Sequence, residues 1–462
     1  MGNRDLAEPP DSGPPGGGPA PTGSCLFART LTRAALTLVL AAGVARAEEG
    51  GLSLEKAVRT ALERNERAQA AEARFQASRA RASGARAFFL PNLTAAGNYT
   101  RRPYQTLQTV RGETATLQHY NALSSTATMT LNIFDARAFP LYRQAVQERE
   151  ASRLNAANDR RVLSFDAAEA FLTALSAEQV LGAAQRRLTF AQKNLKDASA
   201  RFEAQIASSN DVTRAELELA TAERERTGAE GDVQTARLSL GYLLDTDVQG
   251  ALETPAAFLL AAAGSHGGVD DLIVRARQLR ADVAAGRRHA EALRASAREP
   301  LLRVLPSLTA SGLYRTTNEI GVTGHRHDGN ATLSLGWHLF DGGRGRADRA
   351  ERLAMARVAD LDVQAAQRRV MLEVRSAIVA LANRQAAITQ ASVAVAVAQK
   401  NARQTAELYR QGLANELQAA DANVGLFEAE VALARARYGL ALAYLDLRAA
   451  RGLDPLGEEP TP

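Results

Sequence analysis

ATLSLGWHLFDGGRGRAD, the stretch from Ala331 to Asp348, contains a change of periodicity that decides the fold. Apolar side chains first occupy every second position from Leu333 to Leu339, which is the period of a strand with one apolar face. Asp341, a residue type that caps helix N-termini, then precedes a glycine pair, and no proline follows until Pro455. The sequence therefore predicts a strand that leads directly into a very long helix.

The same junction occurs a second time in the chain. TATMTLNIFDAR, from Thr126 to Arg137, also alternates before it reaches an aspartate, and Asp135 lies 206 positions before Asp341. The pair Leu90-Pro91 is likewise repeated at Leu305-Pro306. A repeat of this length indicates a duplicated unit rather than a solenoid of short repeats.

Each copy is predicted to contain a helical hairpin of unusual length. No proline lies between Pro140 and Pro255, so one helix can run from near Arg137 to a break at 205–210. At ~1.5 Å per residue this helix is on the order of 100 Å long, and such a helix requires a coiled coil or a helical tube. The returning arm of the second copy supports helix-to-helix packing through heptads at Leu417, Val424, Val431, Tyr438 and Leu445.

The strand pairs have the length and pattern of membrane-spanning strands. Residues 93–100 and 124–134 alternate, with a polar, loop-like stretch from Arg101 to Asn121 between them. About 9–11 residues with one apolar face suffice for a tilted strand to cross a bilayer. A soluble hairpin on a helical domain is the alternative, and the length of the following helix argues against it.

The two copies set the expected boundaries. An amphipathic helix from Leu52 to about Phe89 precedes the first hairpin. We expect a signal peptide with an N-terminal extension in 1–47, a first repeat in 48–252, a linker in 253–268, a second repeat in 269–453 and a tail in 454–462. Within the repeats we expect β-hairpins at 91–134 and 306–340, and long helical hairpins at 137–245 and 342–452.

The N-terminus has the pattern of an export signal. Arg29 and Arg33 precede an apolar run from Ala34 to Val44, and Ala45-Arg46-Ala47 is an A-x-A cleavage site. We expect a mature chain that begins at Glu48.

Composition excludes several classes of function. The net charge of +5 is small and charge signs alternate along the helices, which argues against nucleic-acid binding. With six histidines and the single cysteine Cys25 ahead of the apolar run, we find no catalytic constellation, cofactor or metal site. His325-x-His327-Asp328 lies between the predicted strands and is better explained as a solvated loop than as a metal site.

The order of the predicted hairpins and long helices in this sequence resembles that of the TolC-type outer membrane efflux channels. The resemblance spans the mature chain, and it implies a mainly α fold with a small β part. Family members are trimers with a shared twelve-stranded β-barrel on an α-helical tube. The resemblance rests on Leu52-Ser53-Leu54-Glu55-Lys56-Ala57, on Leu-Pro-x-Leu at Leu90 and Leu305, on Leu339-Phe340-Asp341-Gly342-Gly343-Arg344 and on Tyr409-Arg410-Gln411-Gly412-Leu413.

The resemblance implies a passive conduit in the outer membrane, with the helices in the periplasm. Its partners would be two further copies, outer membrane lipid, a periplasmic adaptor and an inner-membrane pump that supplies the energy. The alternatives are a periplasmic coiled-coil adaptor, which would carry a β domain between its helical arms, and a structural coiled-coil protein of the envelope, which would not need two amphipathic strand pairs.

The positions that the resemblance makes informative lie at the helix turns. It implies a gate in which Asp211 pairs with Tyr409 and Asp421 faces the lumen, while Gln418 replaces a second family aspartate. Solvated charges near a helix start remain the alternative for both aspartates. It further implies adaptor docking at the two helix turns, Gln205 with Ile206 and Gly412 with Leu413, and we interpret Asp135 and Asp341 as helix caps at the strand-helix junctions.

Overall fold

A computed structural model describes residues 51–110, 113–264, 266–319 and 325–457. The predicted signal peptide and its cleavage site lie outside the described residues, as does the end of the tail. No helix in these ranges is both long and apolar enough to cross a membrane.

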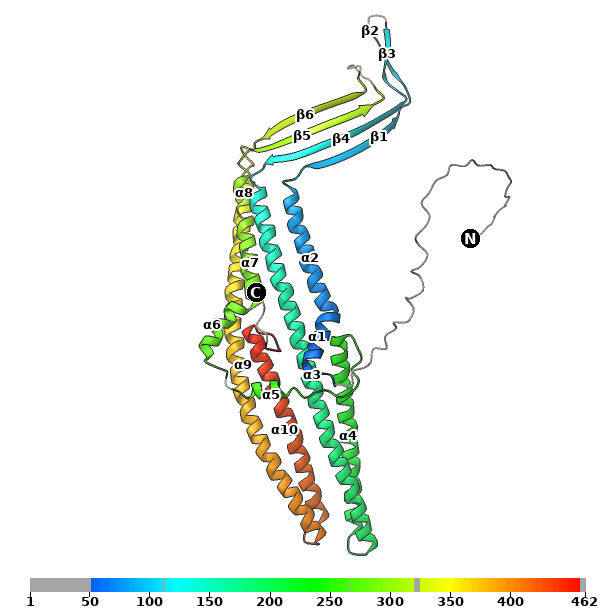
Figure 1. Cartoon of the computed structure of the whole chain (residues 1–462), viewed down its shortest axis with the longest axis vertical. Helices are drawn as coiled ribbons and strands as arrows, with labels where there is room; N and C mark the ends of the chain where they lie inside the picture. Colours follow the sequence, from blue (N-terminus) through cyan, green and yellow to red (C-terminus); the bar gives the residue numbers. More distant parts are fainter. Residues whose placement is uncertain (1–50, 111–112, 265, 320–324, 458–462) are drawn as a thin grey trace, which may run out of the picture. The chain divides into compact units, whose positions relative to one another are not determined.

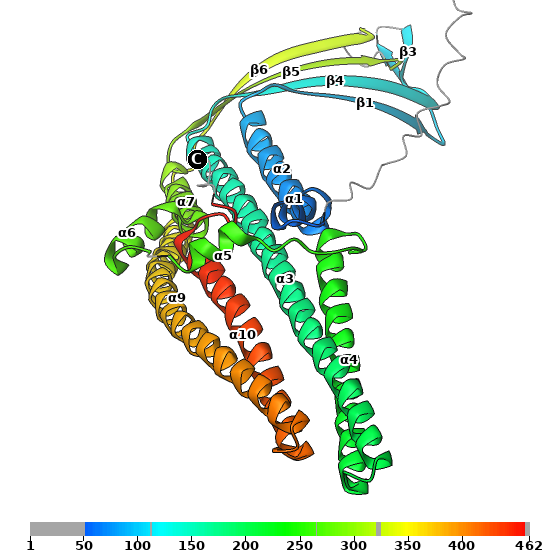
Figure 2. The ribbon, with the colours of Figure 1, turned by 60° about the horizontal axis from the view of Figure 1, so that its bottom comes forward.

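The strands of both copies join in one antiparallel sheet of order β1-β4-β5-β6 (Figure 1). The first copy contributes β1 (Asn92–Arg101) and β4 (Asn121–Phe134), and the second contributes β5 (Ser307–Thr317) and β6 (His327–Gly336). Figure 2 shows the four strands side by side in a curved sheet. In the described chain β1 and β6 are the two edges, and each has one side without a partner strand.

The register gives this sheet one apolar and one polar face. Leu93 on β1 lies opposite Met129 on β4, which lies opposite Gly312 on β5. On the neighbouring positions Thr94 lies opposite Thr128 and Thr130 opposite Ser311. The apolar face, whose large side chains are exposed, includes Leu93, Tyr99, Leu123, Met129, Tyr314, Leu333 and Leu335.

Two expectations about the strands were wrong. The loop predicted at Arg101–Asn121 holds a second sheet, made of β2 (Thr106–Val110) and β3 (Glu113–Gln118). The last strand ends at Gly336 rather than near Leu339, because its partner β5 starts only after Pro306, which has no N–H to donate. Trp337 instead donates its indole N–H to the Val304 carbonyl at 2.8 Å.

The long helical hairpins follow each sheet contribution and run beside one another (Figure 1). The first consists of α3 (Ala138–Glu203) and α4 (Ser209–Leu244), and the second of α9 (Arg344–Arg410) and α10 (Glu416–Arg451). Helix α3, with 66 residues, packs against α4 and α10. Figure 2 shows both hairpins ending on the same side of the molecule, away from the sheet.

Shorter helices cover the upper parts of α3 and α9. They are α1 (Leu54–Arg64), α2 (Glu66–Ala87), α6 (Val269–Leu279) and α7 (Ala281–Ser296), with α5 (Ala256–Ala262) in the connection and α8 (Glu299–Leu302) before β5. The single helix predicted from Leu52 to Phe89 was wrong, because Asn65 divides it. The Asn65 side chain accepts from Arg67 N–H at 2.9 Å, which caps α2, and donates to the Leu243 carbonyl at 3.0 Å.

The core lies where these shorter helices meet the long ones. One buried cluster joins α1, α3, α4 and α10 around Leu54, Phe171 and Leu240. A second joins α6, α7, α9 and α10 around Ile273 and Val374. Small alanine side chains fill much of both clusters, which lets the helices approach closely. The two copies thus share a core through α10, which contributes to both clusters.

Candidate gate at the helix tips

The two helix turns have the same backbone conformation. Gln205 and Gly412, predicted as counterparts, have φ values of 60° and 75° in the left-handed region. Glycine adopts this conformation without strain, whereas the Cβ atom of Gln205 makes it sterically less favourable. The next residues, Ile206 and Leu413, are 74% and 73% exposed. Each tip therefore presents one large apolar side chain.

Each returning helix starts with a capping box. Ser208 caps α4, and the Asp211 carboxylate accepts from Ser208 N–H at 3.1 Å. Asn415 and Gln418 form the same arrangement at the start of α10. The described residues contain no hydrogen bond between Asp211 and Tyr409, because the Asp211 carboxylate is used by its own helix start.

Tyr409 is instead held by an arginine of the other hairpin. The Arg201 guanidinium lies 4.2 Å from the centre of the Tyr409 ring and donates to the Tyr409 carbonyl at 2.8 Å. The Tyr409 side chain is buried, and burial, with the nearby carboxyl of Glu416, raises the pKa of its hydroxyl. Arg201 therefore connects the end of α3 to the end of α9, a contact that no sequence pattern indicates.

Glu416, the first residue of α10, is the second site residue that sequence reasoning missed. Its side chain is only 2% exposed, and Asn194 on α3 donates an amide hydrogen to its Oε1. Burial raises the pKa of Glu416 to about 7. An acidic residue in a first helical turn is so common that its position carries no signal of burial.

Asp421 lies one turn beyond this region on α10 and is exposed. It lines an open groove with Gln418, Leu408 and Asn401. Asp421 therefore lies near the tips, as Asp211 and Tyr409 do, but its side chain lines this exposed groove.

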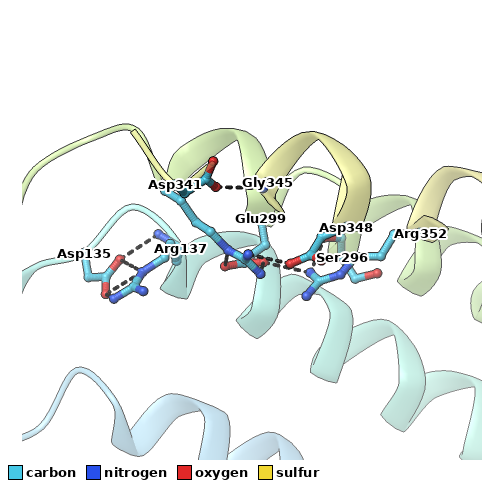
Figure 3. A network of polar contacts seen from close by, with 9 residues as sticks. Asp135, Arg137, Ser296, Glu299, Asp341, Gly345, Asp348 and Arg352 are labelled. Atoms are coloured by element: carbon cyan, nitrogen blue, oxygen red, sulfur yellow. Dashed lines mark hydrogen bonds and ion pairs between the residues drawn. The ribbon is translucent and has the colours of Figure 1, made fainter. Parts of the chain in front are cut away.

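The strand-helix junctions hold their aspartates in local hydrogen bonds (Figure 3). Asp341 accepts from Gly343 and Gly345 N–H at 3.0 and 2.7 Å, and these bonds, that of Gly345 above all, lower its pKa. Asp135 accepts from Arg137 N–H at 2.9 Å and forms an ion pair with the same residue at 2.6 Å. Both carboxylates thus accept from N–H groups where the long helices begin, but the N-cap positions themselves are Arg137 and Gly343, two residues after each aspartate.

A buried ion cluster lies beside the second junction (Figure 3). The Glu299 side chain, 6% exposed, pairs with Arg303 at 2.8 Å and with Arg352 at 2.9 Å. Arg303 also pairs with Asp348 at 2.5 Å, and Arg352 donates to the Ser296 carbonyl. The cluster ties α7 and α8 to the first turns of α9.

The predicted loop position is right for His325, which precedes β6 and lies outside any strand, and wrong for His327 and Asp328, which begin β6. His327 Nδ1 lies 3.1 Å from the Thr316 hydroxyl and 3.3 Å from the Tyr314 hydroxyl. Across the described ranges, no group of three or more His, Cys, Asp or Glu side chains is arranged to hold a metal ion.

Comparisons with known proteins agree with this architecture. A family model described as outer membrane efflux protein matches residues 57–245 and 272–453. Among curated proteins no match is found. The outer membrane protein VceC of Vibrio cholerae is 19% identical over 86% of this chain and 96% of its own, with a TM-score of 0.71.

Two further solved structures have the same fold. The CmeC outer membrane channel of Campylobacter jejuni is 15% identical over 88% of this chain and 87% of its own, with a TM-score of 0.73. The open state of the MtrE outer membrane channel of Neisseria gonorrhoeae is 19% identical over 88% of this chain and 91% of its own, with a TM-score of 0.71.

Proposed function

Because the chain belongs to the outer membrane efflux protein family, we propose that it is the outer membrane channel of a tripartite efflux or secretion system. Family membership places it in the outer membrane as a transport channel and not an enzyme. The finer proposal is a passive conduit from periplasm to exterior, gated at the helix tips. The family match to 57–245 and 272–453 supports the proposed repeats at 48–252 and 269–453.

The main support for a channel is that the two edge strands of the sheet, β1 and β6, each lack a partner on one side. In lipid, each unsatisfied backbone group costs several kcal/mol, so β1 and β6 require partners. All neighbouring strands are antiparallel, so β6 of one copy can pair with β1 of the next in the same sense. Three copies would close twelve strands, with the apolar face toward lipid and the threonine-rich face toward an aqueous lumen.

Assembly tests the proposal directly. We expect the purified protein to be a detergent-requiring trimer that forms ion-conducting channels in planar bilayers, because only a closed barrel satisfies the edge strands. Light scattering with the detergent contribution subtracted measures the state, and bilayer recordings measure conduction. A detergent-free monomer, or a trimer that never conducts, would refute the channel.

We further propose that the tips receive the periplasmic adaptor. Ile206 and Leu413 project into solvent at the ends of the two hairpins, and exposed apolar side chains of this size suit a protein partner. An inner-membrane pump would supply the energy through that adaptor.

Asp421 is proposed to select cations at the narrowed end of the lumen. Replacing Asp421 with Asn should lower the cation-to-anion permeability ratio by roughly fivefold, since unit charges about 4 Å apart interact by ~1 kcal/mol in water, and ~1.36 kcal/mol is a factor of ten. Conductance should stay unchanged because the two side chains are equal in size. Reversal potentials in a salt gradient measure the ratio, with Asp270→Asn on α6 as the matched control. Equal ratios in the two variants would place the selective ring elsewhere.

A further inference from the structure

Two buried carboxyl groups on the returning helices α4 and α10 are not among the predicted gate residues Asp211, Tyr409 and Asp421. Glu416 on α10 and Glu218 on α4 are 2% and 8% exposed. Both oxygens of Glu218 and the Oε2 of Glu416 have no hydrogen-bond partner among the described residues. Burying an ionised carboxylate without partners is costly, so this arrangement favours a neutral, protonated group.

The basic groups around the pair offset its charge only in part: burial raises the pKa of Glu218 more than Arg187 lowers it. On α3, Arg187 lies near Glu218, but its guanidinium forms an ion pair with Glu225 and stacks 5.0 Å from the Phe427 ring. Arg201, also on α3, is engaged by Tyr409.

The remaining neighbours add acidic rather than basic character. Asp211 on α4 and the Tyr409 hydroxyl on α9 face Glu416, and Asp421 on α10 faces Glu218. Asn194 on α3 is neutral and satisfies only one oxygen of Glu416. Two carboxyl groups in one poorly hydrated site cannot both ionise without mutual repulsion.

We propose that Glu416 and Glu218 form a buried proton-binding pair that fastens the first turn of α10 to α3 and α4. With the proton bound, the start of α10 stays packed; when the proton is lost, this turn loosens. An effect of this pair on transport rests on the proposed gate at the helix tips. The contacts themselves lie within one chain, so they can be tested separately.

The direction of the Glu416 pKa shift determines how the packing at the start of α10 depends on pH. The pKa of Glu416 is raised from 4.5 to about 7, mainly by burial, and burial also raises the pKa of Glu218. A raised pKa means that the proton stabilises the packed state fully below about 4.5, and that this stabilisation is lost as pH rises through about 7. Acidic pH therefore keeps the first turn of α10 packed against α3 and α4, and mildly alkaline pH loosens it.

Hydrogen exchange of the full-length trimer in detergent measures this directly. Between pH 5.5 and 8.5, with rates corrected for intrinsic exchange, we expect protection of residues 416–422 to fall about thirtyfold, since each of the ~1.5 pH units between pH 5.5 and the raised pKa of about 7 corresponds to a tenfold change. Glu416→Gln, which is permanently neutral, should keep acid-like protection at every pH. Glu407→Gln, the same change at a half-exposed site on α9, should behave like the wild type.

A second variant tests the coupling of the two groups. Glu218→Gln removes the neighbouring charge, so the midpoint of the transition should move to lower pH. Wild-type protection that does not change with pH, Glu416→Gln with the wild-type transition, or an unmoved midpoint in Glu218→Gln would each overturn the pair. If protection follows this pattern while single-channel conductance does not change with pH, the proton pair stands and the gate at the tips fails.

Discussion

Replacing Glu299 with alanine is expected to destabilise the protein by about 3 kcal/mol, because the change leaves two arginines around an empty buried position. Removing one partner of a buried ion cluster costs about 3–5 kcal/mol, and the lower end applies because Arg303 and Arg352 are partly exposed. Arg303 keeps Asp348, whereas Arg352 keeps only the Ser296 carbonyl. The loss should therefore loosen the contact between α8 and the start of α9.

The matched control is Glu291→Ala, which removes an ion pair with Arg288 that is half-exposed on both sides. Exposed pairs contribute about 0–1 kcal/mol, so this variant should unfold almost like the wild type. Thermal unfolding followed by helical circular dichroism gives the comparison. Equal midpoints for the two variants would show that the cluster at the junction contributes no more than a surface pair.

The fold class was predictable because two periodicities meet at the junctions. Alternation before Asp135 and Asp341 indicates strands, and the proline-free stretches that follow indicate long helices. The structure and the family match confirm a mainly helical fold with a small β part and a duplicated unit. Family membership also favours a channel over the alternatives of a periplasmic adaptor and a structural coiled-coil protein.

Elements that depend on tertiary contacts could not be predicted in the same way. In the β2–β3 ribbon Leu107 is 58% exposed, so burial of an apolar face does not mark this segment as a pair of strands. The break at Asn65 depends on the Leu243 carbonyl, which is far away in the sequence. At the tips, counting along the copies placed Gln205 and Gly412 at equivalent positions, and both have positive φ.

The side-chain partners at the tips were beyond sequence reasoning. Asp211 was predicted as the partner of Tyr409, and this pairing stays a prediction, while in the described chain its carboxylate takes part in the capping box of α4. Arg201 is one of many arginines on helix surfaces, and only the packing of α3 beside α9 sets it against the Tyr409 ring. A capping box can be predicted because its residues are neighbours in the sequence, whereas a contact between residues more than 200 positions apart cannot.

Replacing Arg201 with alanine is expected to open the tips and raise single-channel conductance. The cation–π contact contributes about 0.5–2 kcal/mol and the hydrogen bond to the Tyr409 carbonyl about 1 kcal/mol. Three protomers together would lose on the order of 5 kcal/mol. A shift of ~5.5 kcal/mol moves an equilibrium from 1:99 to 99:1, so a mostly closed channel would become mostly open.

Variants of Tyr409 separate this contact from the alternative in which its hydroxyl bonds Asp211. Tyr409→Phe keeps the ring and the backbone carbonyl, so the Arg201 contact persists and conductance should stay near wild type. Tyr409→Ala removes the ring and should open the channel partly, as should Arg201→Lys, because an ammonium lacks the planar fork that stacks and donates together. Planar-bilayer recordings at one salt concentration measure all four variants. If Tyr409→Phe opens the channel as far as Arg201→Ala does, the hydroxyl and not the ring holds the tip, through Glu416 or Asp211.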